Sequence, residues 1–389
     1  MSLSEPVLPL SEPVCSIIFS YSGGYNYPHR WVCKSFREVL PEINPLLYLD
    51  HLIRDGRKPK EIQASEKLMQ QALNQHLFHL LKFCKEYIPV DILCKSARKA
   101  DVEVLQWCKE EGFTYSEHDV YVATIDSREV KVLDWIKDNL LLPETNFTDY
   151  VAEIGFLDGL KWYVAQGKYP DLSALHFSVY GKHIEVVEYL LSLGTETDNQ
   201  LCSYAAGNGD LDMLKLLMEK GCLCNGATFP QAASSGNLEM CKWLKERNIP
   251  WNEQVCAQAA LEGHLELLQW LRREGCPWNE ITPAFAARGG HLELLRWVMS
   301  NGCLWSARVY YEAASVGNLH IMEFAYSRGC PWDEYVCYMA AYSGRLDILK
   351  WLINHGCPWD RRVYDTALQR GHTEIVDCVL RNLGKRVWE

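Results

Sequence analysis

Residues 263–280 read GHLELLQWLRREGCPWNE, and close copies of this phrase recur through the second half of the chain. The loop part, GCPWNE from Gly275, returns as GCLWSA from Gly302, GCPWDE from Gly329 and GCPWDR from Gly356, at a constant 27-residue step. A fixed spacing of this kind indicates a repeat architecture in which each repeat is one structural unit. The recurring cysteine, proline and tryptophan could form a metal site, a redox site, a binding surface or repeated packing contacts.

A glycine before each second helix fixes the register of the repeat. Seven glycines follow a strict 27-residue step: Gly209, Gly236, Gly263, Gly290, Gly317, Gly344 and Gly371. Weaker matches extend the register backward, with one 28-residue step: Lys182, Gly155, Arg128 and Ala100. The register predicts eleven units over residues 91–389, and residues 76–83 are a candidate for a degenerate twelfth.

Each unit carries start and stop signals for two helices. The first helix follows a column of residues whose side-chain oxygen can accept a free N–H of the first turn: Asp171, Asp198, Asn225, Asn252, Asn279, Ser306, Asp333 and Asp360. The second helix carries an apolar stripe, which in one unit comprises Leu265, Leu267, Leu268, Trp270 and Leu271. It stops at a column that suits the left-handed residue after a helix: Gly167, Gly194, Gly221, Asn248, Gly275, Gly302, Gly329 and Gly356. Each unit is therefore predicted to be helix, tight turn, helix, loop.

A helical pair this short cannot bury its own apolar face, whereas stacked copies can. The sequence therefore predicts an all-α solenoid of about eleven helical hairpins. Paired alanines, such as Ala259-Ala260, are expected to let neighbouring first helices approach closely.

The phrase GHLELLQWLRREGCPWN resembles the ankyrin phrase G-H-L-E-V-V-K-L-L-L-x-x-G-A-D-V-N, and TPAFAA from Thr282 is similar to T-P-L-H-x-A-A. Ankyrin units are longer, at about 33 residues, so the resemblance implies that the helical hairpin is kept and the β-turn finger is largely lost. Arrays with this short unit and a G-C-P-W loop are similar to those abundant in large DNA viruses of amoebae and in some protists.

The resemblance places the loop tryptophans where ankyrin repeats have a buried valine. We expect these residues to form a core ladder between neighbouring units, and the alternative is an aromatic rail that binds ligands: Trp251, Trp278, Trp305, Trp332 and Trp359. A tryptophan column in the second helices is expected in the core by the same logic: Trp107, Trp135, Trp162, Trp243, Trp270, Trp297 and Trp351.

No sequence pattern points to catalysis, a metal or a cofactor. The recurring cysteines lie one per unit, and helix layers about 8–10 Å apart are too distant for a disulfide. The pair Cys222-x-Cys224 lacks the second ligand pair of a zinc site. The run His264-Leu-Glu266 mimics half of a zinc deaminase signature without its P-C-x-x-C half, so we expect such histidines to act as caps and turn ties. We therefore predict no catalytic, cofactor-binding or metal-binding residue and no enzymatic activity.

Net charge and residue composition indicate which class of partner the protein binds and where in the cell it is found. The 389 residues carry a net charge of −11, and an acidic chain without a Lys/Arg run repels phosphates, so nucleic acid is not an expected partner. No 18-residue apolar stretch or secretory signal is present, and sixteen cysteines then indicate reduced thiols. We expect a monomer without membrane association in the cytoplasm, the host cytoplasm if the protein is viral, with the nucleus as an alternative.

Residues 1–45 lie outside the repeat register, and residues 46–90 are predicted to be a helical linker or a degenerate capping repeat before the array at 91–389. The N-terminal segment resembles an F-box, although S-G-G-Y-N-Y replaces its usual middle helix, and the matching residues are Leu8, Pro9, Ile17, Ile18, Phe19, Trp31, Val32 and Phe36. The resemblance implies that these residues contact the Skp adaptor of a cullin–RING ubiquitin ligase. The alternative is an amphipathic helical cap that covers the first repeat.

Positions that vary between units are expected to face outward, and in ankyrin repeats the residues after the alanine pair lie on the binding surface. The predicted partner-binding groove comprises Tyr204, Gln231, Gln258, Glu262, Phe285, Arg288, Glu312, Met339, Tyr342 and Gln369. Two functions remain open at this point. The chain is either an adaptor that presents a captured protein to a ubiquitin ligase, or an ankyrin-type scaffold or decoy with no ligase link.

Overall fold

The computed structural model describes residues 45–57, 63–140 and 147–383. All regular elements in these ranges are helices, in agreement with the all-α prediction. The segments before the repeats are α4 (Pro45–Arg54), α5 (Glu66–Asn74), α6 (Phe78–Phe83) and the short 3-10 helix η2 (Lys85–Tyr87). The eight F-box-like residues lie outside the described part of the chain, so the adaptor contact stays a prediction.

Eleven consecutive helical pairs follow between Ile92 and Leu383, as the repeat register predicted. The first helices are α7 (Ile92–Arg98), α9 (Glu117–Ser127), α11 (Thr148–Glu153), α13 (Leu172–Tyr180), α15 (Leu201–Gly207), α17 (Thr228–Ser234), α19 (Glu253–Leu261), α21 (Ile281–Gly289), α23 (Arg308–Val316), α25 (Glu334–Tyr342) and α27 (Arg361–Gln369). The second helices are α8 (Val102–Glu110), α10 (Val130–Asn139), α12 (Leu157–Ala165), α14 (Ile184–Ser192), α16 (Leu211–Glu219), α18 (Leu238–Glu246), α20 (Leu265–Arg273), α22 (Leu292–Ser300), α24 (Leu319–Ser327), α26 (Leu346–Asn354) and α28 (Thr373–Leu383).

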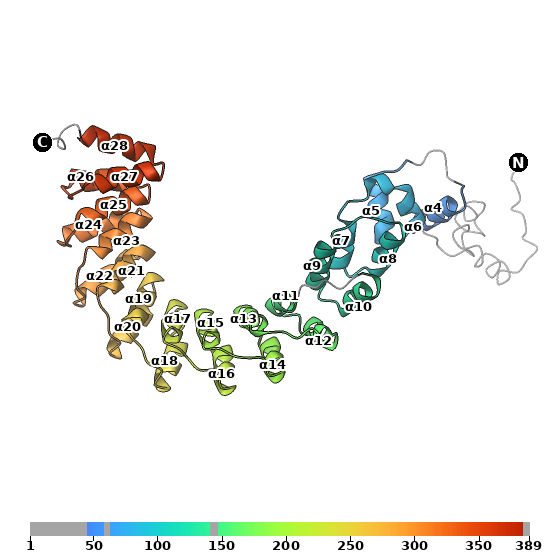
Figure 1. Cartoon of the computed structure of the whole chain (residues 1–389), viewed down its shortest axis with the longest axis horizontal. Coiled ribbons are helices and arrows are strands. Elements are labelled where there is room, and N and C mark those ends of the chain that lie inside the picture. Colours follow the sequence, from blue (N-terminus) through green and yellow to red (C-terminus); the bar gives the residue numbers. More distant parts are fainter. Residues whose placement is uncertain (1–44, 58–62, 141–146, 384–389) are drawn as a thin grey trace, which may run out of the picture. The chain divides into compact units, whose positions relative to one another are not determined.

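The described residues form two compact units. One contains α4 to α10 together with α12, and the other contains α11 and α13 to α28. In the second unit the first helices pack side by side along one face, whereas each second helix packs mainly on its own first helix (Figure 1). The predicted boundaries at residues 45 and 90 remain predictions.

The core of the second unit lies between its two helix layers. Ala259 and Ala260 are fully buried, which explains how neighbouring first helices pack so closely. Leu268 and Leu271 of the second-helix stripe are also fully buried. The predicted stripe was too wide, because Leu265 and Trp270 are only half-buried at its edges.

The predicted column supplies the N-cap of four first helices, at Asp171, Asn252, Asp333 and Asp360. At Asp198, Asn225 and Asn279 the helix begins later than predicted, although the side chain still bonds the turn where it starts. Seven side-chain oxygens accept the backbone N–H two residues further on, at 2.8–3.1 Å: those of Asp171, Asp198, Asn225, Asn252, Asn279, Asp333 and Asp360. At Ser306 the prediction was wrong, because its buried hydroxyl has no hydrogen-bond partner among the described residues. The Ser306 carbonyl instead accepts the N–H of Val309.

Both columns of predicted helix ends adopt the left-handed conformation throughout, and even the weaker letters Ala100, Arg128 and Lys182 do so. Glycine is required at Gly263 for a second reason. Its φ is +81°, and a Cβ atom built there would lie 2.5 Å from the His291 ring of the following unit. The glycine at this turn therefore sets how closely two units stack.

Within the described residues, no helix has both the length and the apolar character needed to cross a membrane.

The substitutions Gly263→Ala and Gly275→Ala distinguish the stability lost through backbone strain from the stability lost when contact with the following unit is disturbed. Both positions are left-handed, at φ +81° and +86°, but a Cβ at Gly275 meets nothing within 4 Å. Each alanine should cost about 1–2 kcal/mol of backbone strain, and Gly263→Ala should lower the urea midpoint further because it also displaces His291.

The extra loss should shrink in a His291→Ala background, where the clashing ring is absent. Equal midpoints for the two alanine variants would show that contact between units does not restrict this turn.

Candidate protein-interaction surface

The recurring cysteines are buried links between successive loops. The thiols of Cys276, Cys303, Cys330 and Cys357 each donate a hydrogen bond to the backbone carbonyl 24 residues earlier, with sulfur–oxygen distances of 3.3–3.6 Å. Each accepting carbonyl belongs to a residue of the capping column. The described cysteines are all free thiols, so this part of the opening phrase serves packing.

The loop tryptophans do not lie in the core, and the prediction of a buried ladder was wrong for them. All five are half-buried. Three of them pack edge-on against second-helix tryptophans, with centroid distances of 6.0–6.4 Å for the pairs Trp251–Trp270, Trp278–Trp297 and Trp332–Trp351. Trp305 packs at 6.0 Å against Phe324, which replaces the tryptophan in its unit. We call these four pairs the tryptophan ladder.

Cations from the chain itself cover three of the four pairs of the tryptophan ladder, whereas Trp332 and Trp351 pack against the rings of Tyr326 and His355. The Arg272 guanidinium lies 4.1 Å from the centroid of the Trp278 ring, and the Lys245 ammonium lies 5.3 Å from that of Trp251. Arg296 covers Phe324 at 4.5 Å. Cation–π contacts of this kind stabilise the fold and occupy the ring faces that a ligand would need.

The burial of the second-helix tryptophans decreases along the chain. Trp107, Trp135 and Trp162 are buried as predicted, and the Trp162 indole donates a hydrogen bond to Asp134 at 2.7 Å. The later members are half-buried, contrary to the prediction: Trp243, Trp270, Trp297 and Trp351. Sequence alone missed this difference because the column keeps the same letter while its surroundings change.

None of the ten predicted groove residues lies in the buried core. Six are exposed, namely Tyr204, Gln231, Glu262, Arg288, Tyr342 and Gln369, and four are half-buried, namely Gln258, Phe285, Glu312 and Met339. Arg288 and Glu312 approach each other at 3.9 Å between their side-chain nitrogen and oxygen. Their participation in binding stays a prediction.

A cluster of tyrosines that the groove prediction missed lies beside Tyr342. The rings of Tyr311 and Tyr335 meet edge-on at 5.0 Å, those of Tyr335 and Tyr338 stack at 4.8 Å, and those of Tyr338 and Tyr342 lie 6.0 Å apart. We call these four residues the tyrosine surface. Three of them follow the helical spacing 335, 338 and 342 in EYVCYMAAY, a signal that a comparison of single columns between units does not detect.

The tyrosine surface differs from the tryptophan ladder in its ring faces. Arg370 covers Tyr342 at 3.5 Å, but no lysine or arginine of the described residues lies over Tyr311, Tyr335 or Tyr338. Tyr335 is 39% exposed and carries no cation, so part of its ring is available to a partner, and Tyr342 is 40% exposed beside Arg370.

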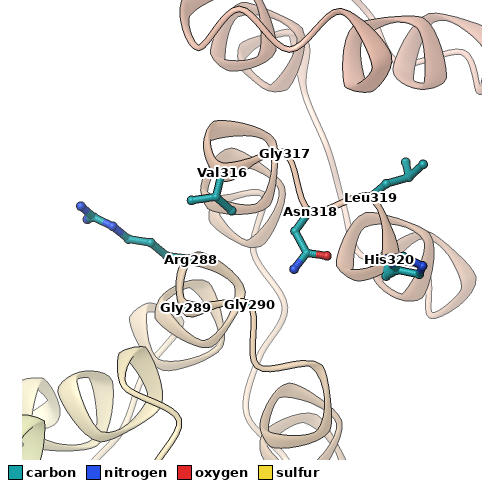
Figure 2. Close-up of a pocket in the computed structure, with 8 residues that line it drawn as sticks. All are labelled: Arg288, Gly289, Gly290, Val316, Gly317, Asn318, Leu319 and His320. Carbon is teal, nitrogen blue, oxygen red and sulfur yellow. The ribbon is translucent and has the colours of Figure 1, made fainter.

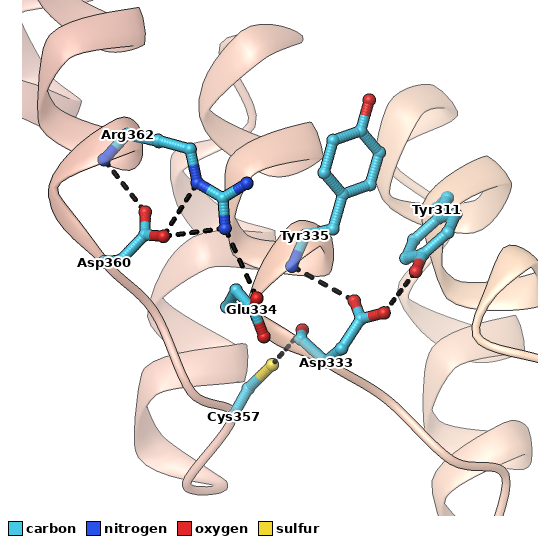
Figure 3. A network of polar contacts seen from close by, with 7 residues as sticks. All are labelled: Tyr311, Asp333, Glu334, Tyr335, Cys357, Asp360 and Arg362. Atoms are coloured by element: carbon cyan, nitrogen blue, oxygen red, sulfur yellow. Dashed lines mark hydrogen bonds and ion pairs between the residues drawn. The ribbon is translucent and has the colours of Figure 1, made fainter.

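A polar network holds the tyrosine surface in place (Figure 3). The Asp333 carboxylate accepts hydrogen bonds from the Tyr311 hydroxyl and, at 3.0 Å, from the backbone N–H of Tyr335. Burial is the larger cause that raises the pKa of Tyr311, and the hydrogen bond to Asp333 is the second cause. Arg362 bonds Asp360 at 2.7 Å and Glu334 at 3.4 Å, which links neighbouring first helices. One capping carboxylate thus starts α25 and also orients Tyr311 from the preceding unit.

No cluster of three or more histidine, cysteine or acidic residues in the described ranges could hold a metal ion. The histidines of the H-x-E phrases serve as turn ties: the Nε2 atoms of His264 and His291 donate to backbone carbonyls of the preceding unit at 2.9 and 3.0 Å. Neither imidazole caps its own helix, so that half of the prediction was wrong.

Thiol reactivity tests the burial of the cysteine column. Cys224 takes the loop-tryptophan position in its unit and is half-buried, and a hydrogen bond with the Cys202 thiol lowers its pKa. Burial raises the pKa of Cys330 to about 12. Since the thiolate is the reactive form, iodoacetamide at pH 7.5 should label Cys224 well before Cys330, as followed by peptide mass spectrometry. Labelling of Cys330 at the same rate would contradict this burial pattern.

The capping carboxylate of Asp360 should make a pH-dependent contribution to stability. Hydrogen bonding to Arg362 lowers its pKa, so this stabilisation is present above the unfolded-state value of about 3.9 and is lost as the pH falls through the folded-state value. Asp360→Asn retains a capping side chain but removes the charge. Its urea midpoint should be slightly lower than that of the unsubstituted protein at pH 6, and the difference should vanish in acid. A difference that persists at pH 2 would exclude the ion pair as its source.

The chain was compared with family models, curated sequences and solved structures of known proteins. A family model described as ankyrin repeats (3 copies) matches residues 149–228 and 175–255. No curated protein sequence matches the chain. Among solved structures, the human ASB11 ankyrin repeat domain is 19% identical with a TM-score of 0.35, and the match covers 40% of this chain and 84% of that one.

The chain also matches the maize pentatricopeptide repeat protein PPR10, at 14% identity and a TM-score of 0.32 over 98% of this chain and 69% of that one. PPR10 in complex with an 18-nucleotide psaJ RNA element is 11% identical with a TM-score of 0.36, and the match covers 96% of this chain and 61% of that one. Ankyrin repeats are scaffolds for protein–protein interaction. The family model thus identifies ankyrin repeats within residues 149–255, and helical pairs of the same kind continue on both sides of that match in the described residues.

Proposed function

We propose that this chain is a non-enzymatic adaptor that binds a protein partner through the exposed face of its first helices. The observation that carries this proposal is the contrast between the two aromatic surfaces. Arginine and lysine side chains of the same chain cover three of the four pairs of the tryptophan ladder. In the tyrosine surface a cation covers Tyr342 alone, and tyrosine is among the residues that dominate binding energy at interfaces.

The first-helix face offers two aromatic patches to a partner. One is the tyrosine surface on α23 and α25, and the other comprises Phe177, Tyr180 and Tyr204 on α13 and α15. Gln231 and Gln258 lie on the intervening helices α17 and α19. Four helix layers separate α15 from α23, which is roughly 32–40 Å at about 8–10 Å per layer. A partner that contacts both patches would therefore need an extended surface.

We further propose that the F-box-like residues 8–36 bring the captured protein to a Skp adaptor of a cullin–RING ubiquitin ligase. The support is the resemblance of Leu8-Pro9 and of residues 17–21 and 31–37 to the F-box pattern. A scaffold or decoy with the same array and no ligase link is the second candidate, favoured by the departure of S-G-G-Y-N-Y from that pattern. Transfer of ubiquitin would belong to other subunits of the ligase.

The double substitution Tyr335→Ala/Tyr338→Ala tests the binding face. A partner captured with the full chain and then purified should bind this variant at least about 30-fold more weakly, because interface hot spots contribute about 2 kcal/mol or more. Tyr169→Ala is the matched control, since Tyr169 is an exposed tyrosine in a loop. Unchanged affinity in the double variant, measured by calorimetry, would reject the tyrosine surface as the binding face.

A binding assay with a purified Skp adaptor tests the second part of the proposal. The full chain should bind the adaptor, Pro9→Ala/Phe19→Ala should lose binding, and Tyr335→Ala/Tyr338→Ala should keep it, because the two surfaces act separately. Absence of binding by the folded, unsubstituted chain would favour the scaffold or decoy.

A further inference from the structure

Histidines in one column tie three of the units to the unit before them. The imidazoles of His183, His264 and His291 donate from Nε2 to the carbonyl oxygen 30 residues earlier, at 2.8, 2.9 and 3.0 Å. Each ring also covers the turn glycine of the preceding unit, so that a Cβ atom at Gly155, Gly236 or Gly263 would lie 2.3–2.6 Å from it. Imidazole therefore fills the space between successive turns at these three junctions.

Other residues occupy this column at most of the remaining junctions, and the junction after His291 carries asparagine. The Asn318 side-chain oxygen accepts the N–H of Ile321 at 3.2 Å and caps α24. Its amide group makes no described hydrogen bond to the carbonyl of Arg288, which is the equivalent acceptor in the preceding unit, and that carbonyl receives no other hydrogen bond described here. The backbone acceptor that histidine satisfies elsewhere is therefore left open.

An open hollow of about 460 Å³ lies at this junction (Figure 2). It is lined by Arg288, Gly289 and Gly290 of one turn and by Val316, Gly317, Asn318, Leu319 and His320 of the next. In Figure 2 Asn318 lies between the two turns, with its amide nitrogen directed toward Gly290. The Asn318 amide thus borders this space, and Arg288, whose carbonyl is equivalent to the one that His291 reaches one unit earlier, also lines it.

We propose that this hollow binds the imidazole side chain of a histidine on the protein partner. This inference rests on the proposed function, because it requires that the array binds a protein. The chain itself places imidazole over the turn glycine at four other junctions, those of His183, His264, His291 and His372. A neutral imidazole has one N–H donor and one acceptor nitrogen, which match the Arg288 carbonyl and the Asn318 amide.

The position of the hollow fits a role in partner recognition. Arg288 belongs to the predicted groove and pairs at 3.9 Å with Glu312 on the next first helix. Val316, 40% exposed, supplies an apolar wall. A histidine that enters from the first-helix face would satisfy a backbone group that is otherwise open, which gives specificity at one point of the interface.

Free imidazole is the probe, added to the full chain with ¹⁵N-labelled glycine. In the unsubstituted protein we expect saturable shifts of the amide signals of Gly290 and Gly317. The signals of Gly236 and Gly263 should not move, because His264 and His291 already fill their sites. The ligand 1-methylimidazole keeps the ring but lacks the N–H donor, and it should bind at least tenfold more weakly.

Two variants make the test independent of any single substitution. Asn318→His should place the chain's own imidazole in the hollow, raise the melting temperature and weaken imidazole binding at least tenfold. His291→Ala should open an equivalent hollow one unit earlier, so that Gly263 responds to imidazole.

The inference would be overturned if imidazole caused no chemical-shift change at Gly290 and Gly317 in the unsubstituted protein. Shift changes of the same size in Asn318→His and in the unsubstituted protein would also overturn it. A response to guanidinium or acetamide but not to imidazole would also overturn it, since the hollow would then suit a different side chain. If only the hollow fails while Tyr335→Ala/Tyr338→Ala still loses the partner, the proposed function stands without it. If the hollow binds imidazole but the tyrosine variant keeps the partner, the proposed binding face fails instead.

Discussion

The stacking of each helical pair on the next is the interaction on which the rest of this structure depends. A single pair exposes an apolar side that only its neighbours can cover. Leu268 and Leu271 are fully buried in this way, and burial of such a side chain is worth about 1.5–3 kcal/mol. Hydrogen bonds add to the apolar packing, because the Cys276 thiol bonds a carbonyl of the preceding loop and the His291 imidazole bonds a carbonyl of the preceding unit.

Because the first helices pack closely, the face that they form differs from the face formed by the loops and second helices. Small residues such as Ala259 and Ala260 bring these helices together, and their outward positions are free to vary. The second helices contact one another less than the first helices do. The tryptophan ladder lies between the loops and the second helices, and lysine or arginine side chains cover three of its four pairs. Aromatic residues therefore stabilise the fold on one surface and remain available to a partner on the other.

The repeat register, the capping column and the turn residues could be predicted from the sequence because local chemistry determines them. A left-handed residue ends each helix even where the letter is Lys182 or Arg128, so spacing predicted the turn better than residue type did. Ser306 failed as a cap because a column predicts the position of a side chain but not its hydrogen bond.

Features that depend on contacts between units could not be predicted in the same way. The exposure of Trp278 depends on the partner ring and on Arg272, which belong to neighbouring elements. The tyrosine surface arises from helical spacing within α25 and from Tyr311 in the preceding unit. The hollow at Asn318 becomes visible only when the histidine ties of other junctions have been seen.

Hydroxyl-radical footprinting of the full chain, alone and in complex with its captured partner, tests the central claim most directly. Oxidation of each aromatic side chain would be quantified by peptide mass spectrometry. We predict that Tyr335, Tyr338 and Tyr342 become protected in the complex while Trp278 and Trp332 keep their reactivity. Protection of the tryptophans with unchanged tyrosines would contradict this claim and would place the partner on the tryptophan ladder.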